Sequence, residues 1–426
     1  MLLDFEIRNW KSFKEKNFIT SIASREEQHS DRRAYIPKFS MNVLPALGIF
    51  GGNASGKSNL IDALKFIKDL VVNYQDNQTS IPVEKYFLDE DSLKDNVDFN
   101  LQLLIDDNIY HFSIKLNEKR IISEKLEFEN SSRKYTLYQR DHDEITLGEK
   151  YKDNKKLSVI ADGTRPNRLF LSNTIDQQNK EFQQVYDWFY NLKIIQPESF
   201  LLQNELDMED YICALNEFLP RLDTGIKKVE FKEVDINNTQ VPEKLLDQVI
   251  FNLGSNNADN AIISNSKGLV VKFEKDEDDQ VIASQLIARH MTRKGLIDFN
   301  LSMESMGTLR TIELIPLFFE LNKGSSVIVI DELDRSLHTS MTRGLIEYYL
   351  RHYNKESRSQ LIFTCHDTNM LTQNVFRRDE LWLVERNKYS ESNISSVGDF
   401  TDVKKNNRLD TLYMQGRLGG MPRIDI

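Results

Sequence analysis

One stretch of the sequence, from Gly51 to Ser58, has the residue types and spacing of a phosphate-binding loop. It reads GGNASGKS and satisfies the pattern G-x-x-x-x-G-K-[ST]. In such loops, backbone N–H groups surround the phosphates, the lysine supplies a positive charge and the hydroxyl ligates Mg²⁺. We therefore predict that Lys57 binds phosphate and that Ser58 binds the metal. The other residues of this region predicted to contact a nucleotide are Gly51, Asn53, Ala54, Ser55, Gly56 and Asn59.

Two carboxylates follow a second apolar run. The run VIVI at 327–330 is typical of a buried strand, and Asp331 and Glu332 come directly after it. Carboxylates at a strand end are common on their own, but a phosphate-binding loop in the same chain gives them separate roles. We predict that Asp331 holds Mg²⁺ opposite Ser58, and that Glu332 orients or deprotonates the water that attacks a γ-phosphate. The pattern therefore predicts an ATPase with ATP and Mg²⁺ as cofactors.

A short segment before these carboxylates, ESMGTLR at 304–310, stands where ABC-type ATPases carry their signature. Alone, its Ser305 and Gly307 indicate only the capped start of a helix. The position relative to Asp331 favours a second role, in which Ser305 hydrogen-bonds a γ-phosphate held by another subunit. We predict that Ser305 and Gly307 complete a nucleotide site across a subunit interface.

A histidine ends the next apolar strand. His366 follows QLIFT at 360–364, a placement that predicts an imidazole beside the γ-phosphate, where its hydrogen bonds could sense hydrolysis. A lone histidine is more often structural, but the preceding Asp331 and Glu332 favour the functional interpretation. Ser336-Leu337-His338 resembles a D-loop, a segment that contacts the partner in a dimer, and His338 needs no catalytic role.

The elements around these residues predict an α/β fold. Alternating apolar residues predict an N-terminal strand, an antiparallel β-meander from about 97 to 148, and a mostly helical segment from 180 to about 264. Short apolar runs predict strands that flank the chemistry, at 44–50, 327–330, 360–364 and 380–385. A helical pattern at 59–72 follows the glycine loop. The sequence contains no sustained heptad repeat, so we expect no long coiled coil.

By these observations the sequence resembles the RecF and SMC branch of ABC-type ATPases, whose chains open with an N-F-[RK]-S-F-like segment. Here that segment is NWKSF at 9–13. The chain is similar, more closely, to a bacterial subfamily used in phage defence and abortive infection, which includes RloA, AbiL and the AriA subunit of the PARIS system. The motifs that carry this resemblance are FGGNASGKSNLIDAL, NRLFLSN, LDTGIKKVEF, ESMGTLR, VIDELDRSLH, QLIFTCHD, RRDELWLVE and GRLGGMP.

This resemblance implies an ABC-type P-loop ATPase head with a β-meander lobe and an inserted helical lobe. It also implies that Lys11 faces the nucleotide and that subunits pair head to tail. Two positions depart from the family pattern. Met306 stands where an acidic residue is usual, and only Gln177 and Gln178 are candidates for the Q-loop glutamine.

The expected domain boundaries follow from this pattern. They are an N-terminal ATPase lobe with the β-meander at 1–175, a mainly helical insertion at 176–294, a C-terminal ATPase lobe at 295–390, and a tail at 391–426.

Composition limits the classes of function. The chain has 426 residues, a formal net charge of −11, and 40% hydrophobic residues, which together indicate a folded protein whose overall field repels nucleic acid. It shows no apolar run long enough for a membrane helix and no signal-peptide pattern at its start, so we expect a cytoplasmic protein without membrane contacts. Two cysteines do not support a disulfide framework or a Cys-rich zinc site.

Three hypotheses for the function remain open. The leading one is the sensor or regulatory ATPase of an anti-phage system, which pairs with itself and holds and releases a separate, TOPRIM-like effector nuclease in response to a phage protein or DNA. The alternative is a RecF-like repair ATPase that binds DNA across an ATP-closed dimer; the acidic charge counts against it. The third is a nucleotide-gated scaffold, against which Glu332 argues.

Overall fold

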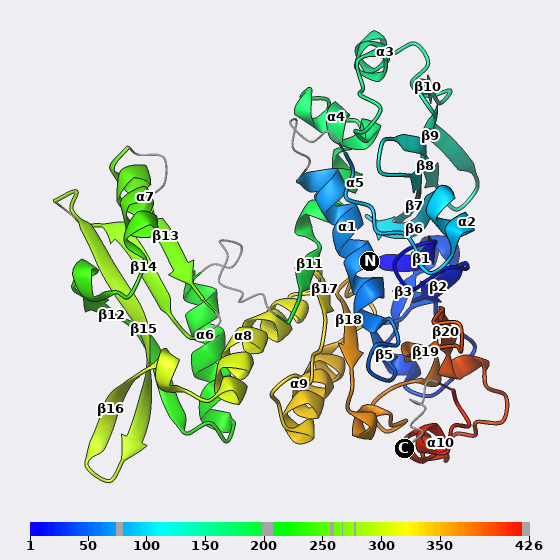
Figure 1. Cartoon of the computed structure of the whole chain (residues 1–426). Helices are drawn as coiled ribbons and strands as arrows, with labels where there is room; N and C mark the ends of the chain where they lie inside the picture. Colours follow the sequence, from blue (N-terminus) through cyan, green and yellow to red (C-terminus); the bar gives the residue numbers. More distant parts are fainter. Residues whose placement is uncertain (74–79, 198–207, 256–259, 266, 277, 420–426) are drawn as a thin grey trace. The chain divides into compact units, whose positions relative to one another are not determined.

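The computed structural model describes residues 1–426 except 74–79, 198–207, 256–259, 266, 277 and 420–426 (Figure 1). The chain divides into two compact units, each described here by itself. The first contains Met1–Ile194, Leu321–Leu333 and Glu347–Ile426, and the second contains Ile195–Glu320 and Asp334–Ile346. Residues 176–194 and the C-terminal tail therefore belong to the first unit, whereas the sequence predicted them as parts of separate domains.

A six-stranded sheet in the first unit carries the predicted chemistry. Its order is β11 (Lys193–Ile195), β17 (Val327–Ile330), β18 (Gln360–Cys365), β5 (Ala46–Phe50), β19 (Leu381–Arg386) and β20 (Ser392–Ser396). Strands β17, β18, β5 and β19 run parallel, as their apolar runs predicted, and β20 is antiparallel to β19. Because parallel strands end at one edge of a sheet, the loops after β5, β17 and β18 leave from the same edge.

A seven-stranded antiparallel sheet confirms the predicted N-terminal strand and β-meander. Its order is β10 (Glu144–Leu147), β9 (Lys134–Asp141), β8 (Ile121–Glu129), β7 (Asn108–Leu116), β6 (Val97–Ile105), β1 (Leu2–Arg8) and β2 (Asn17–Thr20). The first strand of the chain thus joins the meander rather than the parallel sheet.

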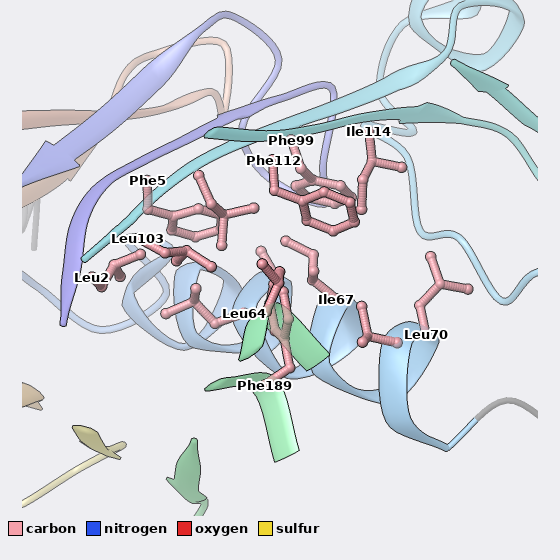
Figure 2. Packing of buried hydrophobic residues seen from close by; sticks show 14 of the residues in the cluster. Leu2, Phe5, Leu64, Ile67, Leu70, Phe99, Leu103, Phe112, Ile114 and Phe189 are labelled. Carbon is pink, nitrogen blue, oxygen red and sulfur yellow. The ribbon is translucent and has the colours of Figure 1, made fainter. Parts of the chain in front are cut away.

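Helix α1 (Lys57–Val72) is anchored by the core of the first unit. Its Leu64 and Ile67 face Phe99 and Phe112 of the antiparallel sheet, and Phe189 of α5 (Gln183–Asn191) closes the cluster (Figure 2). Full burial of each such side chain contributes about 1.5–3 kcal/mol. This packing fixes the helix whose first residue is Lys57.

The remaining elements of the first unit are short. They are β3 (Ala34–Ile36), β4 (Met41–Val43), α2 (Glu90–Lys94), α3 (Lys155–Asp162), α4 (Phe170–Asp176) and α10 (Leu409–Met414). Helix α9 (Thr339–His352) runs from the second unit into the first. In the part of the chain that the structure describes, no helix is long and apolar enough to cross a membrane.

The second unit is built on a five-stranded antiparallel sheet. Strands β12 (Ile226–Val234), β15 (Val281–Thr292), β14 (Val270–Lys275) and β13 (Asn260–Ser264) lie in that order, and β16 (Gly295–Asn300) also pairs with β15. Helices α6 (Met208–Phe218), α7 (Glu243–Gly254) and most of α8 (Met306–Leu321) accompany it.

The expectation of a mainly helical insertion at 176–294 is therefore wrong for most of residues 226–294, which form β12 to β15, although α6 and α7 are helices as predicted. In β12, a register shift between Ile226 and Lys228 interrupts the alternation, so the buried Ile226 and Val229 stand three residues apart. A three-residue spacing of apolar residues is typical of a helix, so the sequence of β12 does not show the alternation expected of a strand.

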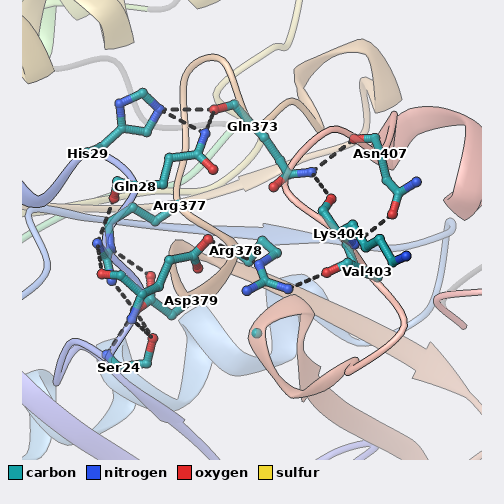
Figure 3. Close-up of polar contacts among 12 residues, drawn as sticks. Ser24, Gln28, His29, Gln373, Arg377, Arg378, Asp379, Val403, Lys404 and Asn407 are labelled. Atoms are coloured by element: carbon teal, nitrogen blue, oxygen red, sulfur yellow. Dashed lines mark hydrogen bonds and ion pairs between the residues drawn. The ribbon is translucent and has the colours of Figure 1, made fainter.

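A polar cluster joins distant parts of the first unit. The buried Arg377 pairs with Asp379 at 2.7 and 2.8 Å and donates to the carbonyl oxygens of Glu26 and Gln28 (Figure 3). Asp379 also accepts hydrogen bonds from the backbone and hydroxyl of Ser24. Since a buried ion pair is costly to break, this cluster holds residues 24–28 against the start of β19.

Glu380 lies next to this cluster and should make the folding stability of the protein depend on pH. Burial raises the pKa of Glu380 from 4.5 to about 8, so folding favours its protonated form. Its contribution to stability is complete below pH 4.5 and is lost as the pH rises through about 8. We expect Glu380→Gln to lose less stability than the wild type between these two values, as measured by thermal unfolding.

The exposed Glu356 offers a matched control, since Glu356→Gln changes the same carboxylate outside the core. Equal pH dependence in Glu380→Gln and the wild type would contradict the prediction.

Candidate nucleotide-binding site

The loop 51–58 links β5 to α1, as predicted, and its glycines are needed for the close approach of other segments. Gly56 has a φ of +114°, and a Cβ there would collide with the hydroxyls of Ser392 and Ser12. A Cβ on Gly51 would collide with the carbonyl oxygen of Val384. Glycine at both positions therefore lets the loop lie against β19, the start of β20 and the segment 9–13.

Lys57 is buried in this loop, with only 4% of its surface exposed. Its Nζ donates to the carbonyl oxygens of Gly51 and Gly52 at 2.8 and 2.9 Å, and it lies 3.3 Å from Nδ1 of His366. The residue thus brings a positive charge to the first turn of α1, where backbone N–H groups already favour an anion.

Ser55 shows that the loop fits a phosphate. Its carbonyl oxygen accepts from the hydroxyl of Ser392 at 2.5 Å, but its own buried Oγ has no hydrogen-bond partner among the described residues. A buried hydroxyl without a partner is costly. A phosphate oxygen in the loop could accept its hydrogen, and the residues present therefore suit this ligand.

Thr364 of β18 contacts both residues that follow β17, the side chain of Asp331 and the backbone of Glu332. Its Oγ1 donates to Oδ1 of the buried Asp331 at 2.5 Å and accepts from the backbone N–H of Glu332 at 2.8 Å. Glu332 has a φ of +51°, which is uncommon for a residue with a side chain and marks a sharp turn at the strand end. Its Oε1 lies 3.8 Å from Nε2 of His366. Glu332, His366 and Lys57 thus form a chain of neighbours.

These side chains line a pocket of about 650 Å³ in the first unit. The predicted residues among its lining are Lys11, Asn53, Ala54, Ser55, Gly56, Lys57, Ser58, Asn59, Glu332 and His366. The other two predicted here, Gly51 and Asp331, are not lining residues: Gly51 accepts a hydrogen bond from Lys57, and Asp331 is joined through Thr364 to the backbone of Glu332. The structure therefore brings together the residues predicted from three separate motifs.

Lys11 lies on the pocket wall with its charge already compensated. Its Nζ donates to Asp62 at 2.8 Å and pairs with Glu84 at 3.2 Å, and it lies 5.7 Å from the centre of the Trp10 ring. Burial opposes the charged form, but the bonds to the two carboxylates outweigh it and raise the pKa of Lys11. The ammonium is therefore held at the pocket by the protein itself.

Several lining residues were not predicted from the sequence: Ser12, Glu84, Lys85, Tyr86, Phe87, Leu88, Arg386 and Ser390. Arg386 ends a parallel strand at the functional edge of the sheet, so the strand pattern could have identified it. Segment 84–88 is an irregular loop without a motif, and only the folded structure brings it to the pocket.

Over residues 47–372, the chain matches the family described as "AAA domain, putative AbiEii toxin, Type IV TA system". The match covers well over half of the sequence. The chain belongs to this family. The matched region of this AAA-domain protein includes Lys57, Asp331, Glu332 and His366, whereas Lys11 precedes it.

Two solved structures are similar to this AAA-domain chain. The SMC head domain from Thermotoga maritima has 14% identity and a TM-score of 0.35, and the match covers 93% of this chain and 98% of that one. The SMC head bound to the C-winged helix domain of ScpA has 14% identity and a TM-score of 0.39, and the match covers 93% of this chain and 97% of that one. These values are too low to transfer a function. No curated protein matches the chain.

The predicted signature residues of this AAA-domain protein belong to the second unit. Ser305 caps α8, since its Oγ accepts from the backbone N–H of Thr308 at 3.1 Å and lies 2.9 Å from the hydroxyl of Thr308. A Cβ on Gly307 would lie 2.8 Å from the carbonyl oxygen of Ser336, so glycine permits close contact with the predicted D-loop. The helix-cap interpretation is thus confirmed, and the contact with a nucleotide stays a prediction.

The other candidates have local roles. Nδ1 of His338 accepts from the backbone N–H of Ser340 at 3.2 Å near the start of α9. Gln177 and Gln178 are not among the described residues that line the pocket, and Gln178 lines a different groove. They therefore gain no support as Q-loop residues.

Proposed function

We propose that this AAA-domain protein binds ATP and Mg²⁺ in the pocket around Lys57 and hydrolyses the γ-phosphate bond. The observation that carries the proposal is the convergence of Lys57, His366 and Glu332 from the ends of three neighbouring parallel strands, with contacts of 3.3 and 3.8 Å. A cation, an imidazole and a carboxylate in this order can bind phosphate, report its position and activate a water.

Each residue then has a distinct task. Ser58 and Asp331 would hold Mg²⁺, which when bound neutralises phosphate charge. Thr364 keeps the carboxylate of Asp331 in one orientation through its 2.5 Å bond. Glu332 orients or deprotonates the attacking water, and His366 lies between Glu332 and Lys57, where it can exchange hydrogen bonds as the phosphate leaves.

The proposal extends to a site shared by two subunits. Ser305 and the N-terminus of α8 offer a hydroxyl and the positive end of a helix dipole, which together favour an anion. We infer that a head-to-tail pair places this helix start against the γ-phosphate bound by the partner. ATP binding would then stabilise the pair, and hydrolysis would release it.

Ser305→Arg tests the shared site. We expect it to lower ATP hydrolysis about 100-fold, because a bulky cation would block closure and remove a donor to the phosphate. ATP binding by the separate subunit should be unchanged. Ser305→Ala is the control for the loss of the helix cap, about 1 kcal/mol, and should retain more activity than the arginine variant. Phosphate release and nucleotide titration give the two readouts.

Mixing two inactive variants makes the test sharper. Ser305→Arg has an intact loop at Lys57, and Lys57→Ala has an intact Ser305, so one mixed pair contains one complete site. Recovery of part of the ATPase activity on mixing would support the arrangement. Assembly and turnover at the wild-type rate by Ser305→Arg alone would exclude it.

We further infer that the pair acts in phage defence, as the regulatory subunit that holds and releases a toxic effector nuclease. The sequence resemblance to RloA, AbiL and AriA supports this role, as does the toxin named in the family description. The neighbouring reading frame distinguishes the alternatives: a TOPRIM-like nuclease gene would support defence, and a replication gene would favour RecF-like repair. A cytoplasmic location stays a prediction.

A further inference from the structure

A second groove lies in the first unit, between the outer strands of the antiparallel sheet and the helices that follow it. Its volume is about 1,280 Å³. In Figure 1, β9, β10 and α3 lie at the end of this sheet away from β1 and β2. We call it the β9 groove; its lining is Tyr110, Phe128, Asn130, Arg133 to Leu137, Gly148 to Tyr151, Lys156, Gln178 to Glu181, and Gln184.

The β9 groove is positively charged within an acidic protein. Its cationic side chains are Arg133, Lys134, Lys150, Lys156 and Lys180, and its lining carboxylates are Glu149 and Glu181; Lys134 also pairs with Glu127, which lies outside the lining. The whole chain, by contrast, has a net charge of −11. Among the described residues, neither Arg133 nor Lys180 forms an ion pair with a carboxylate. This concentration of cations indicates an anionic ligand.

Aromatic rings accompany these cations. Tyr135 is 41% exposed, and the guanidinium of Arg133 lies 5.3 Å from its ring centre. The ring of Phe128 lies 6.4 Å from Tyr135 and 5.3 Å from Tyr110, whose hydroxyl donates to Gln184 at 2.8 Å. The groove therefore presents flat aromatic rings beside positive charges. The contacts among these side chains hold the rings in place.

We propose that the β9 groove binds single-stranded nucleic acid, with phosphates on Arg133 and Lys180 and a base stacked on Tyr135. Cationic grooves with aromatic platforms suit unpaired bases, because every base offers a flat face for stacking. In a duplex these faces are already stacked and the aromatic rings could not reach them. An acidic peptide would use the cations but would not need the rings. The groove shares no lining residue with the Lys57 pocket, so the inference does not depend on the ATPase proposal.

Fluorescence anisotropy with a labelled oligothymidylate of about 15 nucleotides tests the proposal on the full chain. Tyr135→Ala should weaken binding about tenfold through the loss of one stacked base. Lys180→Ala should weaken it and lower the slope of log affinity against log salt by about 1.

Two matched controls are available. Tyr35 has the same 41% exposure as Tyr135 but lies on β3, and Lys119 is an exposed lysine outside the groove. Tyr35→Ala and Lys119→Ala should bind as the wild type does. Lys180→Glu is a second groove variant should Tyr135→Ala fail to fold.

The alternative ligands are tested in the same assay. A labelled duplex of equal length and poly-glutamate should bind more weakly than the single strand. The proposal is overturned by tighter binding of either competitor, by no binding at about 50 mM salt, or by groove variants that bind as their controls do.

Discussion

Lys57→Ala is expected to lower ATP affinity about 100-fold, because it removes charge-assisted hydrogen bonds worth up to about 3 kcal/mol from the phosphates. The side chain points from the first turn of α1 into the glycine loop, where Nζ contacts Gly51, Gly52 and His366 rather than the apolar core. The fold should therefore persist, since the helix is anchored by Leu64 and Ile67. Titration of a fluorescent ATP analogue measures the loss.

Two companion variants make the result specific. Lys57→Met keeps most of the aliphatic stem and loses only the charge, so it should behave like the alanine variant. Lys65 lies on the same helix, pairs with Asp69 at 2.6 Å and is outside the pocket. Lys65→Ala should bind ATP normally. Wild-type affinity in Lys57→Ala would refute the assignment of the loop.

The part of the site that could be predicted from the sequence depends on local patterns. The loop 51–58 can be recognised from its glycines, which are needed where Ser12, Ser392 and Val384 approach the backbone. Asp331, Glu332 and His366 each follow a short apolar run, and such runs become parallel strands that end at one edge of the sheet. A reader of the sequence can therefore place these residues together without knowing their contacts.

The contacts themselves depend on residues far apart in the chain. Nothing near Thr364 indicates that its hydroxyl links Asp331 to the backbone of Glu332. Ser392 joins the hydroxyl of Ser12 to the carbonyl of Ser55, across most of the chain length. Such partners are chosen by tertiary packing, so single-sequence patterns do not contain them.

The fold, like the site, has parts that could be predicted from the sequence and parts that could not. The meander at 97–148 could be predicted because its strands alternate over nine residues with few interruptions. In β12 the shift between Ile226 and Lys228 breaks the alternation, and exposed charged residues such as Lys227 and Lys228 hide it further. The long alternation of the meander strands is therefore visible in the sequence, whereas the interrupted alternation of β12 is not.

Glu332→Gln should retain ATP binding but reduce hydrolysis about 100- to 10,000-fold, the range typical for the loss of a general base. The amide preserves the size of the side chain and can still form a hydrogen bond near His366, which lies 3.8 Å from Glu332 in the native protein. It cannot accept the proton of the attacking water. The bond from the backbone of Glu332 to Thr364 is unaffected by the substitution, so the turn at the strand end should remain.

A variant that binds but does not hydrolyse should also accumulate the ATP-bound pair, because hydrolysis is the step expected to release it. Size-exclusion chromatography with ATP would show this accumulation, and phosphate release would measure turnover. Glu347 is the matched control, with a side chain 27% exposed against 33% for Glu332, and it pairs with Arg351 away from the pocket. Glu347→Gln should hydrolyse ATP normally and form no excess pair. Hydrolysis at the wild-type rate by Glu332→Gln would mean that another group activates the water, and the turn after β17 would then serve to orient Asp331 alone.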